Sequence, residues 1–123
     1  MPDEDIDEAA RELKEFIYRK AKELNIEVEY EELRRGGNYA SDPNHPFIKV
    51  FKSIADQIYG LNLPIGVELG GNDGHYLASK NIPVVCFGPI RSDCNFHGKD
   101  EFIYIDDIGR VKEIIIELAK KKF

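Results

Sequence analysis

The sequence predicts an α/β fold in which helices pack against a mostly parallel sheet. From residue 46 onward, segments with helical spacing of apolar residues alternate with short segments typical of strands. One of them, residues 82–87, is a continuous apolar run bounded by Asn81 and Gly88-Pro89, as in a central strand buried on both faces. Alternation of this kind is the signature of α/β proteins.

The N-terminal part predicts one helix followed by one strand. Apolar residues recur every three or four positions over about residues 4–24, and acidic residues crowd the first turn, where they favour the helix dipole. Residues 26–30 then alternate apolar and acidic side chains, which is typical of a half-buried strand. Turn formers at residues 42–46 mark a boundary between two units, residues 1–40 and residues 41–123.

The C-terminal part predicts three further helices and three strands. Pro46 suits the first position of a helix, and Gly60 suits its end. Asn72 or Asp73 begins a short helix, and Asp106 or Asp107 caps the last one. The expected order is a helix at 46–59, a strand at 65–69, a helix at 72–80, a strand at 82–87, a polar loop at 90–99, a strand at 102–105 and a final helix.

Composition excludes several classes of protein. The 123 residues suffice for one modest domain, and 42% hydrophobic with 33% charged residues indicates a globular chain. A net charge of −6 argues against a partner with a phosphate backbone, so no nucleic acid is expected. No stretch approaches the roughly 20 apolar residues that span a bilayer, and the acidic N-terminus lacks a signal sequence. We therefore expect a cytoplasmic protein without a membrane partner.

The first chemical candidate is the turn Gly70-Gly71-Asn72-Asp73-Gly74-His75-Tyr76, between a predicted strand and a predicted helix. Glycine lets backbone approach a ligand closely, and amides at a helix start attract anions such as a carboxylate. The imidazole of His75 adds a hydrogen-bond donor. The alternative is a tight strand-to-helix turn with Asn72 as the helix cap, and spacing alone does not choose between them.

The second candidate is the loop of residues 88–101, which follows the C-terminal end of the predicted buried strand. Open α/β sheets place their sites at this end. Neutral imidazole is a good zinc ligand, so His97 is the candidate ligand, with Glu101 orienting it. Two alternatives remain: a local metal cluster of Asp93, Cys94 and His97, or an ordinary loop histidine.

Four landmarks follow one another along the chain. They are the run of residues 69–78, the run Ile82-Pro83-Val84-Val85-Cys86-Phe87-Gly88-Pro89, the motif His97-Gly98-Lys99-Asp100-Glu101, and Ile105-Asp106-Asp107 opening the last helix. In order and spacing these landmarks resemble the C-terminal end of the M20 metallopeptidase family, which includes acetylornithine deacetylase, succinyl-diaminopimelate desuccinylase, aminoacylase and glutamate carboxypeptidase. The resemblance covers nearly the whole chain but roughly the last third of a full-length member.

The resemblance implies a fold, a reaction and roles for particular residues. It implies the C-terminal half of an α/β sandwich catalytic domain, preceded by a helix-strand remnant of the lid domain. The family uses two zinc ions and a metal-activated water to hydrolyse amide bonds of N-acyl amino acids or small peptides. By this resemblance His97 is a zinc ligand and Glu101 is the acid that follows it. Gly71, Asn72, Asp73 and His75 lie beside substrate, while Gly37 and Asn38 belong to a lid loop that contacts it.

Two departures from the family pattern matter. Several members carry arginine where this chain has His75, and that arginine binds the substrate carboxylate, so the substrate class is open. The family's His-x-Asp motif, bridging Asp and Glu-Glu pair belong to the N-terminal half, and none of the three histidines here precedes x-Asp. Glu31-Glu32 falls in the lid strand and is expected to be solvated. We therefore expect an engineered piece, a split reading frame or a truncated homologue.

These inferences lead to one interpretation and one rival. The chain is expected to be the C-terminal part of a zinc-dependent amidohydrolase that is inactive alone, because one imidazole cannot hold two zinc ions. It is expected to self-associate or to pair with the missing N-terminal half, because a sheet cut in mid-domain leaves an unpaired edge. The rival is a non-enzymatic α/β module that binds a small carboxylate or mediates oligomerisation.

Overall fold

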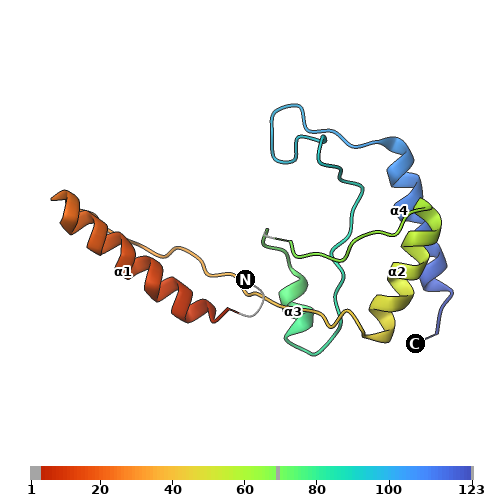
Figure 1. Ribbon diagram of the computed structural model, residues 1–123, viewed down its shortest axis with the longest axis horizontal. Coiled ribbons are helices and arrows are strands. Elements are labelled where there is room, and N and C mark those ends of the chain that lie inside the picture. The colour runs from red at the N-terminus through yellow and green to blue at the C-terminus, as the bar shows by residue number, and fades with distance from the viewer. Residues whose placement is uncertain (1–3, 69, 123) are drawn as a thin grey trace.

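The computed structural model describes residues 4–68 and 70–122, and these contain helices but no strand (Figure 1). The helices are α1 (Ile6–Leu24), α2 (Pro46–Tyr59), α3 (Gly74–Ala78) and α4 (Ile105–Ala119). All four lie where the sequence predicts a helix, although α3 is shorter than expected. Among the described residues, no helix is long and apolar enough to cross a membrane.

The predicted α/β fold is wrong, because none of the expected strands forms within the described residues. Residues 26–30, 65–68, 82–87 and 102–104 have no regular structure, and Leu69 lies outside the described residues. Apolar, β-branched composition favours extended backbone, but a strand exists only when a neighbouring strand takes up its hydrogen bonds. At Val84, for example, the backbone amide and carbonyl bond to the Ser41 hydroxyl, at 3.0 and 2.8 Å.

Helix ends are set by residues at or next to each terminus. At α1, Asp5 Oδ1 accepts the amides of Asp7 (2.9 Å) and Glu8 (3.1 Å), and Asn25 ends the helix in the left-handed region at φ 54°. At α2, Pro46 occupies the first turn, and His45 Nδ1 accepts the amide of Phe47 at 3.2 Å. His45 is therefore a helix cap, which is a local structural role.

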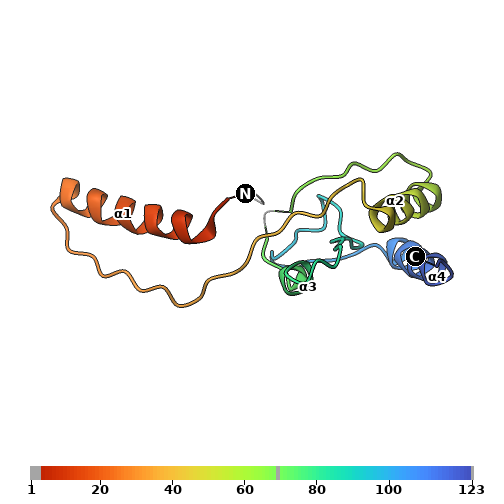
Figure 2. The ribbon, with the colours of Figure 1, turned by 90° about the horizontal axis from the view of Figure 1, so that it is seen from below.

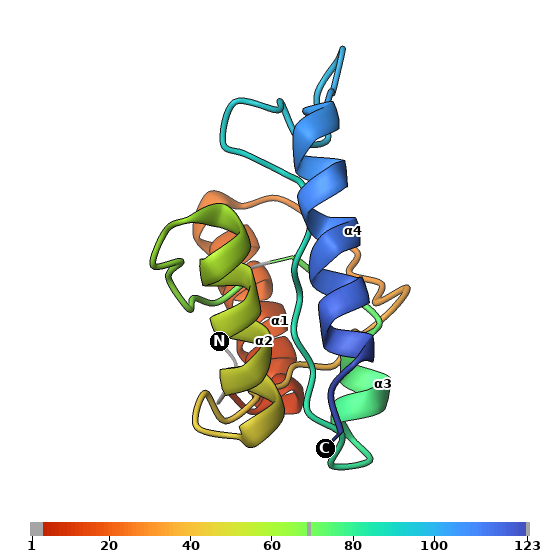
Figure 3. The same ribbon diagram turned by 90° about the vertical axis from the view of Figure 1, so that its right-hand side faces the viewer.

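The hydrophobic core lies between α2 and α4, which run side by side (Figures 1 and 3). Ile54 and Ala55 of α2 meet Ile114 of α4, which is 1% exposed. Partly buried apolar side chains surround them, among them Phe51 and Leu118. Fully burying an aliphatic side chain contributes about 1.5–3 kcal/mol, so this small cluster is the main stabilising contact between elements.

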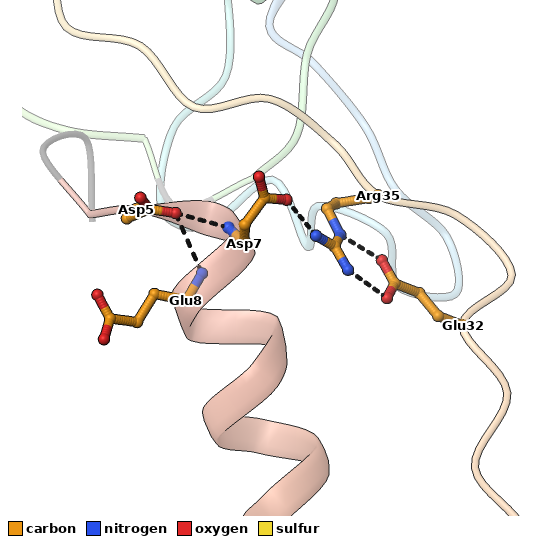
Figure 4. Close-up of polar contacts among 5 residues, drawn as sticks. All are labelled: Asp5, Asp7, Glu8, Glu32 and Arg35. Atoms are coloured by element: carbon orange, nitrogen blue, oxygen red, sulfur yellow. Dashed lines mark hydrogen bonds and ion pairs between the residues drawn. The ribbon is translucent and has the colours of Figure 1, made fainter.

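By contrast, α1 projects away from the remainder of the chain, and residues 26–41 run back along it (Figures 1 and 2). Arg35 connects this return segment, residues 26–41, to the start of α1 (Figure 4). Its Nε and Nη2 donate to the two Glu32 carboxylate oxygens at 2.5 Å, and its Nη1 pairs with Asp7. The Arg35 guanidinium holds the pKa of Glu32 below its ordinary value.

Candidate functional site

The turn at residues 70–75 is organised by Asn72. Its Oδ1 accepts the amide of Gly74 at 2.8 Å and the hydroxyl of Tyr39 at 2.9 Å. Its backbone carbonyl accepts a hydrogen bond from His75 Nδ1 at 2.9 Å. Because a carbonyl can only accept, this contact places a proton on Nδ1 of the half-buried imidazole. Asp73 makes no side-chain hydrogen bond to the α3 amides, so Asn72 is the capping side chain.

The loop at residues 36–39 packs directly on this turn, although the contacting residues are at least 33 positions apart in sequence. A Cβ atom added at Gly37 would lie 2.8 Å from His75 Cδ2, and one added at Gly74 would lie 2.4 Å from Tyr39 Oη. A side chain at either position would therefore force its neighbour, His75 or Tyr39, to shift. Asn38 points elsewhere, with its amide donating to the Glu4 carbonyl at 2.6 Å.

A cavity of about 480 Å³ opens beside the turn. Small-molecule sites typically enclose about 300–1,000 Å³. Gly37, Asn38, Gly71 and Asn72 line it, together with apolar side chains from α2 and from residues 84–87. Four of the residues predicted to lie near substrate thus share one cavity wall. Asp73, His75, His97 and Glu101 are not among the lining residues.

Cys86 lies in the cavity wall and pairs with a carboxylate. Its Sγ donates to Glu68 Oε2 at 2.6 Å. This hydrogen bond, with partial burial, raises the pKa of the Cys86 thiol to about 11. The side chain is exposed, so the prediction of a buried residue in mid-strand is wrong. The raised pKa favours the protonated thiol at neutral pH, and only the thiolate is a strong nucleophile.

His97 lies exposed in the loop between residue 88 and α4. Its backbone is left-handed at φ 60°, and its amide donates to Glu101 Oε2 at 3.1 Å. The imidazole stacks on Phe96, with ring centroids 3.9 Å apart and an interplanar angle of 35°. Glu101 therefore braces the backbone of His97, whereas the sequence suggested that it orients the ring.

The described residues do not by themselves form a zinc centre. Within residues 4–68 and 70–122, no three His, Cys, Asp or Glu side chains lie close enough to hold a metal ion. Asp93 Oδ2 accepts from the Tyr104 hydroxyl at 2.7 Å, and the buried Cys94 Sγ accepts the Arg91 amide at 3.3 Å. The local cluster of Asp93, Cys94 and His97 is thus not assembled. His97 has the donor chemistry of one zinc ligand, and zinc usually takes four.

The two candidate regions lie apart in the molecule. Figures 1 and 3 place α3 towards one end and the loop of residues 90–104 at the other. The structure therefore brings Gly37, Asn72 and His75 together and leaves His97 and Glu101 in a separate loop.

Sequence reasoning missed the role of Asp107, which it assigned as a helix cap. Asp107 is 2% exposed, and Arg91 and Arg110 both bind its carboxylate. The Arg91 guanidinium, with a smaller effect from Arg110, holds the pKa of Asp107 below its ordinary value. The spacing of three between Asp107 and Arg110 was a visible signal for this pair. The Arg91 contact spans 16 residues and had no local signal.

Comparison with known proteins assigns the chain to a family. The model of peptidase family M20/M25/M40 matches residues 3–121. Peptidase T of Listeria monocytogenes serotype 4a (strain HCC23) is 30% identical over an alignment of 118 residues, with coverage of 85% of this chain and 28% of that protein. Peptidase T of Shewanella pealeana is 34% identical over 76 residues, covering 62% of this chain and 18% of that protein.

The chain thus spans less than a third of the length of the curated relatives it matches. No solved structure matches it significantly. The family match covers both candidate regions, the turn at residues 70–75 and the loop that carries His97. The chain belongs to peptidase family M20/M25/M40.

Proposed function

We propose that this chain is the C-terminal part of a zinc-dependent hydrolase that cleaves the amide bond of a small peptide or an N-acyl amino acid. The observation that carries the proposal is the family match over residues 3–121. The cavity beside Asn72 supports it, because its walls combine apolar side chains with a glycine-rich turn that a small polar substrate can approach.

In this proposal the two candidate regions have different tasks. Gly71 and Asn72 contribute to the substrate wall, and Gly37 and Asn38 of the lid loop line the same cavity. Asp73 and His75 flank that wall, and the Nδ1 proton of His75 is already committed to the Asn72 carbonyl. We assign residues 1–40 to the lid and residues 41–123 to the catalytic unit.

His97 is the proposed zinc ligand, and Glu101 holds its backbone in place. Zinc, when bound in a complete site, polarises the substrate carbonyl and activates water. Because the described residues assemble no further ligand cluster, the other ligands and the general base are proposed to come from protein outside this chain. The greater length of the relatives supports this, and the chain alone is expected to be inactive.

A chimera tests the proposal. This chain replaces the region of the Listeria relative that it matches, and peptide hydrolysis and zinc content are measured. The chimera should hydrolyse a small peptide, and His97→Ala should abolish hydrolysis and lower zinc content. His45→Asn is the matched control, because it alters a helix-capping histidine outside both candidate regions. A folded chimera whose zinc content is unaffected by His97→Ala would contradict the assignment.

A second function, self-association without catalysis, is favoured by one observation. Large apolar side chains are exposed along the chain, among them Leu33 (85%), Ile105 (83%) and Ile115 (60%). Exposed apolar surface of this extent often marks an interface. Sedimentation over a range of concentrations tests self-association. A monomer at every concentration would contradict it, whereas a defined homo-oligomer would support it.

A further inference from the structure

We propose that Asp107 is a positioning residue, which fixes the loop of residues 91–104 on the α2–α4 core through Arg91. Asp107 is the buried charged residue among the described side chains, at 2% exposure. A buried carboxylate is costly unless hydrogen bonds and opposite charges compensate it. Asp107 has both, and its main partner comes from the start of the loop that carries His97.

The contact between Arg91 and Asp107 is bidentate. Arg91 Nε donates to Oδ2 at 2.5 Å, and Nη2 donates to Oδ1 at 3.0 Å. Two parallel bonds fix the direction of the guanidinium as well as its distance, which a single point charge does not. Arg110 Nη1 adds a third bond to Oδ1 at 3.0 Å, so both carboxylate oxygens are occupied.

Arg91 also joins the two ends of the loop of residues 91–104. Its guanidinium lies over the Tyr104 ring, 4.1 Å from the centroid, and the Tyr104 hydroxyl donates to Asp93. Next to Arg91, Cys94 donates its amide to the Arg91 carbonyl at 3.1 Å, while Phe102 donates to the Cys94 carbonyl at 3.1 Å. Residues 91–94 and 102–104 are therefore bonded to each other at the two ends of the loop, and we call these residues the closed base of the loop.

The base is connected to the hydrophobic core through α4. The Arg110 guanidinium lies 5.1 Å from the ring centroid of Tyr59, at the end of α2. Asp107 itself lies in the first turn of α4, two turns before the buried Ile114. Rigid elements hold a site more accurately than a free loop does, so this connection gives the loop a defined place.

The closed base positions the exposed segment between Asn95 and Glu101, which includes His97. The contacts within this segment are local: Gly98 donates to the Asn95 carbonyl, and His97 to Glu101. They set its shape but do not attach it to the helices. Its placement therefore depends on Arg91 and Asp107. The inference rests on the proposed function for the role of His97, while the attachment itself is tested independently.

Cys94 provides the probe, because its thiol is 1% exposed inside the closed base. In a Cys86→Ser background, modification by a disulfide reagent should be slow and should quicken when the base opens. Asp107→Asn should raise the Cys94 rate by about tenfold or more, since local opening governs access to a buried group. Asp106→Asn is the matched control, because Asp106 is exposed on the same turn. Its rate should equal that of the background protein.

Arg91 gives a second, independent arm, which applies even when Asp107→Asn does not fold. Arg91→Met should raise the Cys94 rate as Asp107→Asn does, and Arg91→Lys should fall between, because lysine keeps the charge without the fork. Cys94 in the double variant, Arg91→Met with Asp107→Asn, should react no faster than in either single variant. In these two single variants and in the double variant, the ring resonances of His97 should shift while the helical circular dichroism stays unchanged.

Unchanged Cys94 rates in a folded Arg91→Met protein would overturn the inference. So would equal rates for Asp106→Asn and Asp107→Asn. A chimera that fails to bind zinc would refute the proposed function, whereas the Cys94 rates would be unaffected. The two failures are therefore distinguishable.

Discussion

Helices α1 and α4 have the same kind of amphipathic pattern but different surroundings. In α1, all of whose residues are described, Ala21 alone is buried, and Leu13 and Phe16 are 53% and 48% exposed. In α4, Ile114 is 1% exposed against α2. Periodicity therefore makes a helix in both places, while burial requires a partner, which among the described helices α4 has and α1 lacks.

The two helices consequently depend on different forces. α1 is held by its own ends and surface: the Asp5 cap, and Arg11 paired with Glu8 (3.0 Å) and Glu15 (3.3 Å). Exposed pairs of this kind contribute little, because water competes for both charges. α4 is held by apolar burial, which is the larger effect. We expect the two helices to unfold separately, with α1 the less stable.

The largest expected effect is at the α2–α4 contact. Ile114→Ala should lower the free energy of unfolding by about 2–5 kcal/mol, because it removes buried methyl groups and leaves a cavity. Urea unfolding followed by circular dichroism measures it. Ile115→Ala on the same helix (60% exposed) and Leu13→Ala on α1 are controls that should change it far less. Equal losses at all three positions would mean that α1 also has a packing partner.

Acid should weaken the α4 region next. The folded pKa of Asp107 lies below its ordinary 3.8, chiefly because Arg91 binds the carboxylate. The unfolded chain therefore protonates the Asp107 carboxylate more readily than the folded protein does. The stabilisation from this carboxylate is complete well above its ordinary pKa and is lost as pH falls through the lower, folded pKa. Unfolding midpoints measured from about pH 5 to about pH 3 should fall, and Asp107→Asn should flatten the dependence. An unchanged slope in Asp107→Asn would contradict this.

A smaller effect is expected at the cap of α1. Asp5→Ala removes the acceptor for the amides of Asp7 and Glu8 and should cost about 1 kcal/mol of helix stability. Amide hydrogen exchange resolves it: protection in α1 should fall, while that of Ile114 in α4 stays constant. Loss of protection in both helices would show that they unfold together.

The smallest effect is expected at Arg35. Arg35→Gln breaks its pairs with Glu32 and Asp7, which lie on the surface. The urea midpoint should stay within error, and exchange in the first turn of α1 should quicken slightly. High salt should remove the difference, because it screens exposed charges. A clear drop in the midpoint would assign the return segment a structural role beyond the surface.

Helices could be predicted from this sequence because their signals are local. The spacing of apolar residues lies within the helix that it predicts, and Pro46 and Gly60 lie at the ends of theirs. Strands could not be predicted reliably, because their hydrogen bonds depend on a neighbour that local sequence does not reveal. Residues 82–87 have the composition of a buried strand, yet Val84 bonds to the Ser41 side chain.

In the candidate site, too, local features could be predicted from the sequence and contacts between distant residues could not. The turn at Asn72 and the exposed His97 were recognisable from residue type and spacing. The packing of Gly37 against His75 and the Arg91–Asp107 pair join residues distant in sequence, which no periodicity reports. Asp107 was taken for a cap because aspartate is a preferred N-cap residue, but the helix begins two residues earlier, with Tyr104 at the N-cap position. The roles of His97, Glu101, Asp73 and His75 stay predictions.

The left-handed backbone of the His97 loop changes how a ligand deletion has to be interpreted. Asn95, His97 and Asp100 all have φ values between 53° and 60°, a region that alanine enters at a cost and glycine enters freely. His97→Ala thus removes an imidazole and keeps an unfavourable backbone, whereas His97→Gly removes the same imidazole and relaxes it. If both variants lose a property equally, the imidazole supplied it. If glycine alone loses it, the rigidity of the loop supplied it.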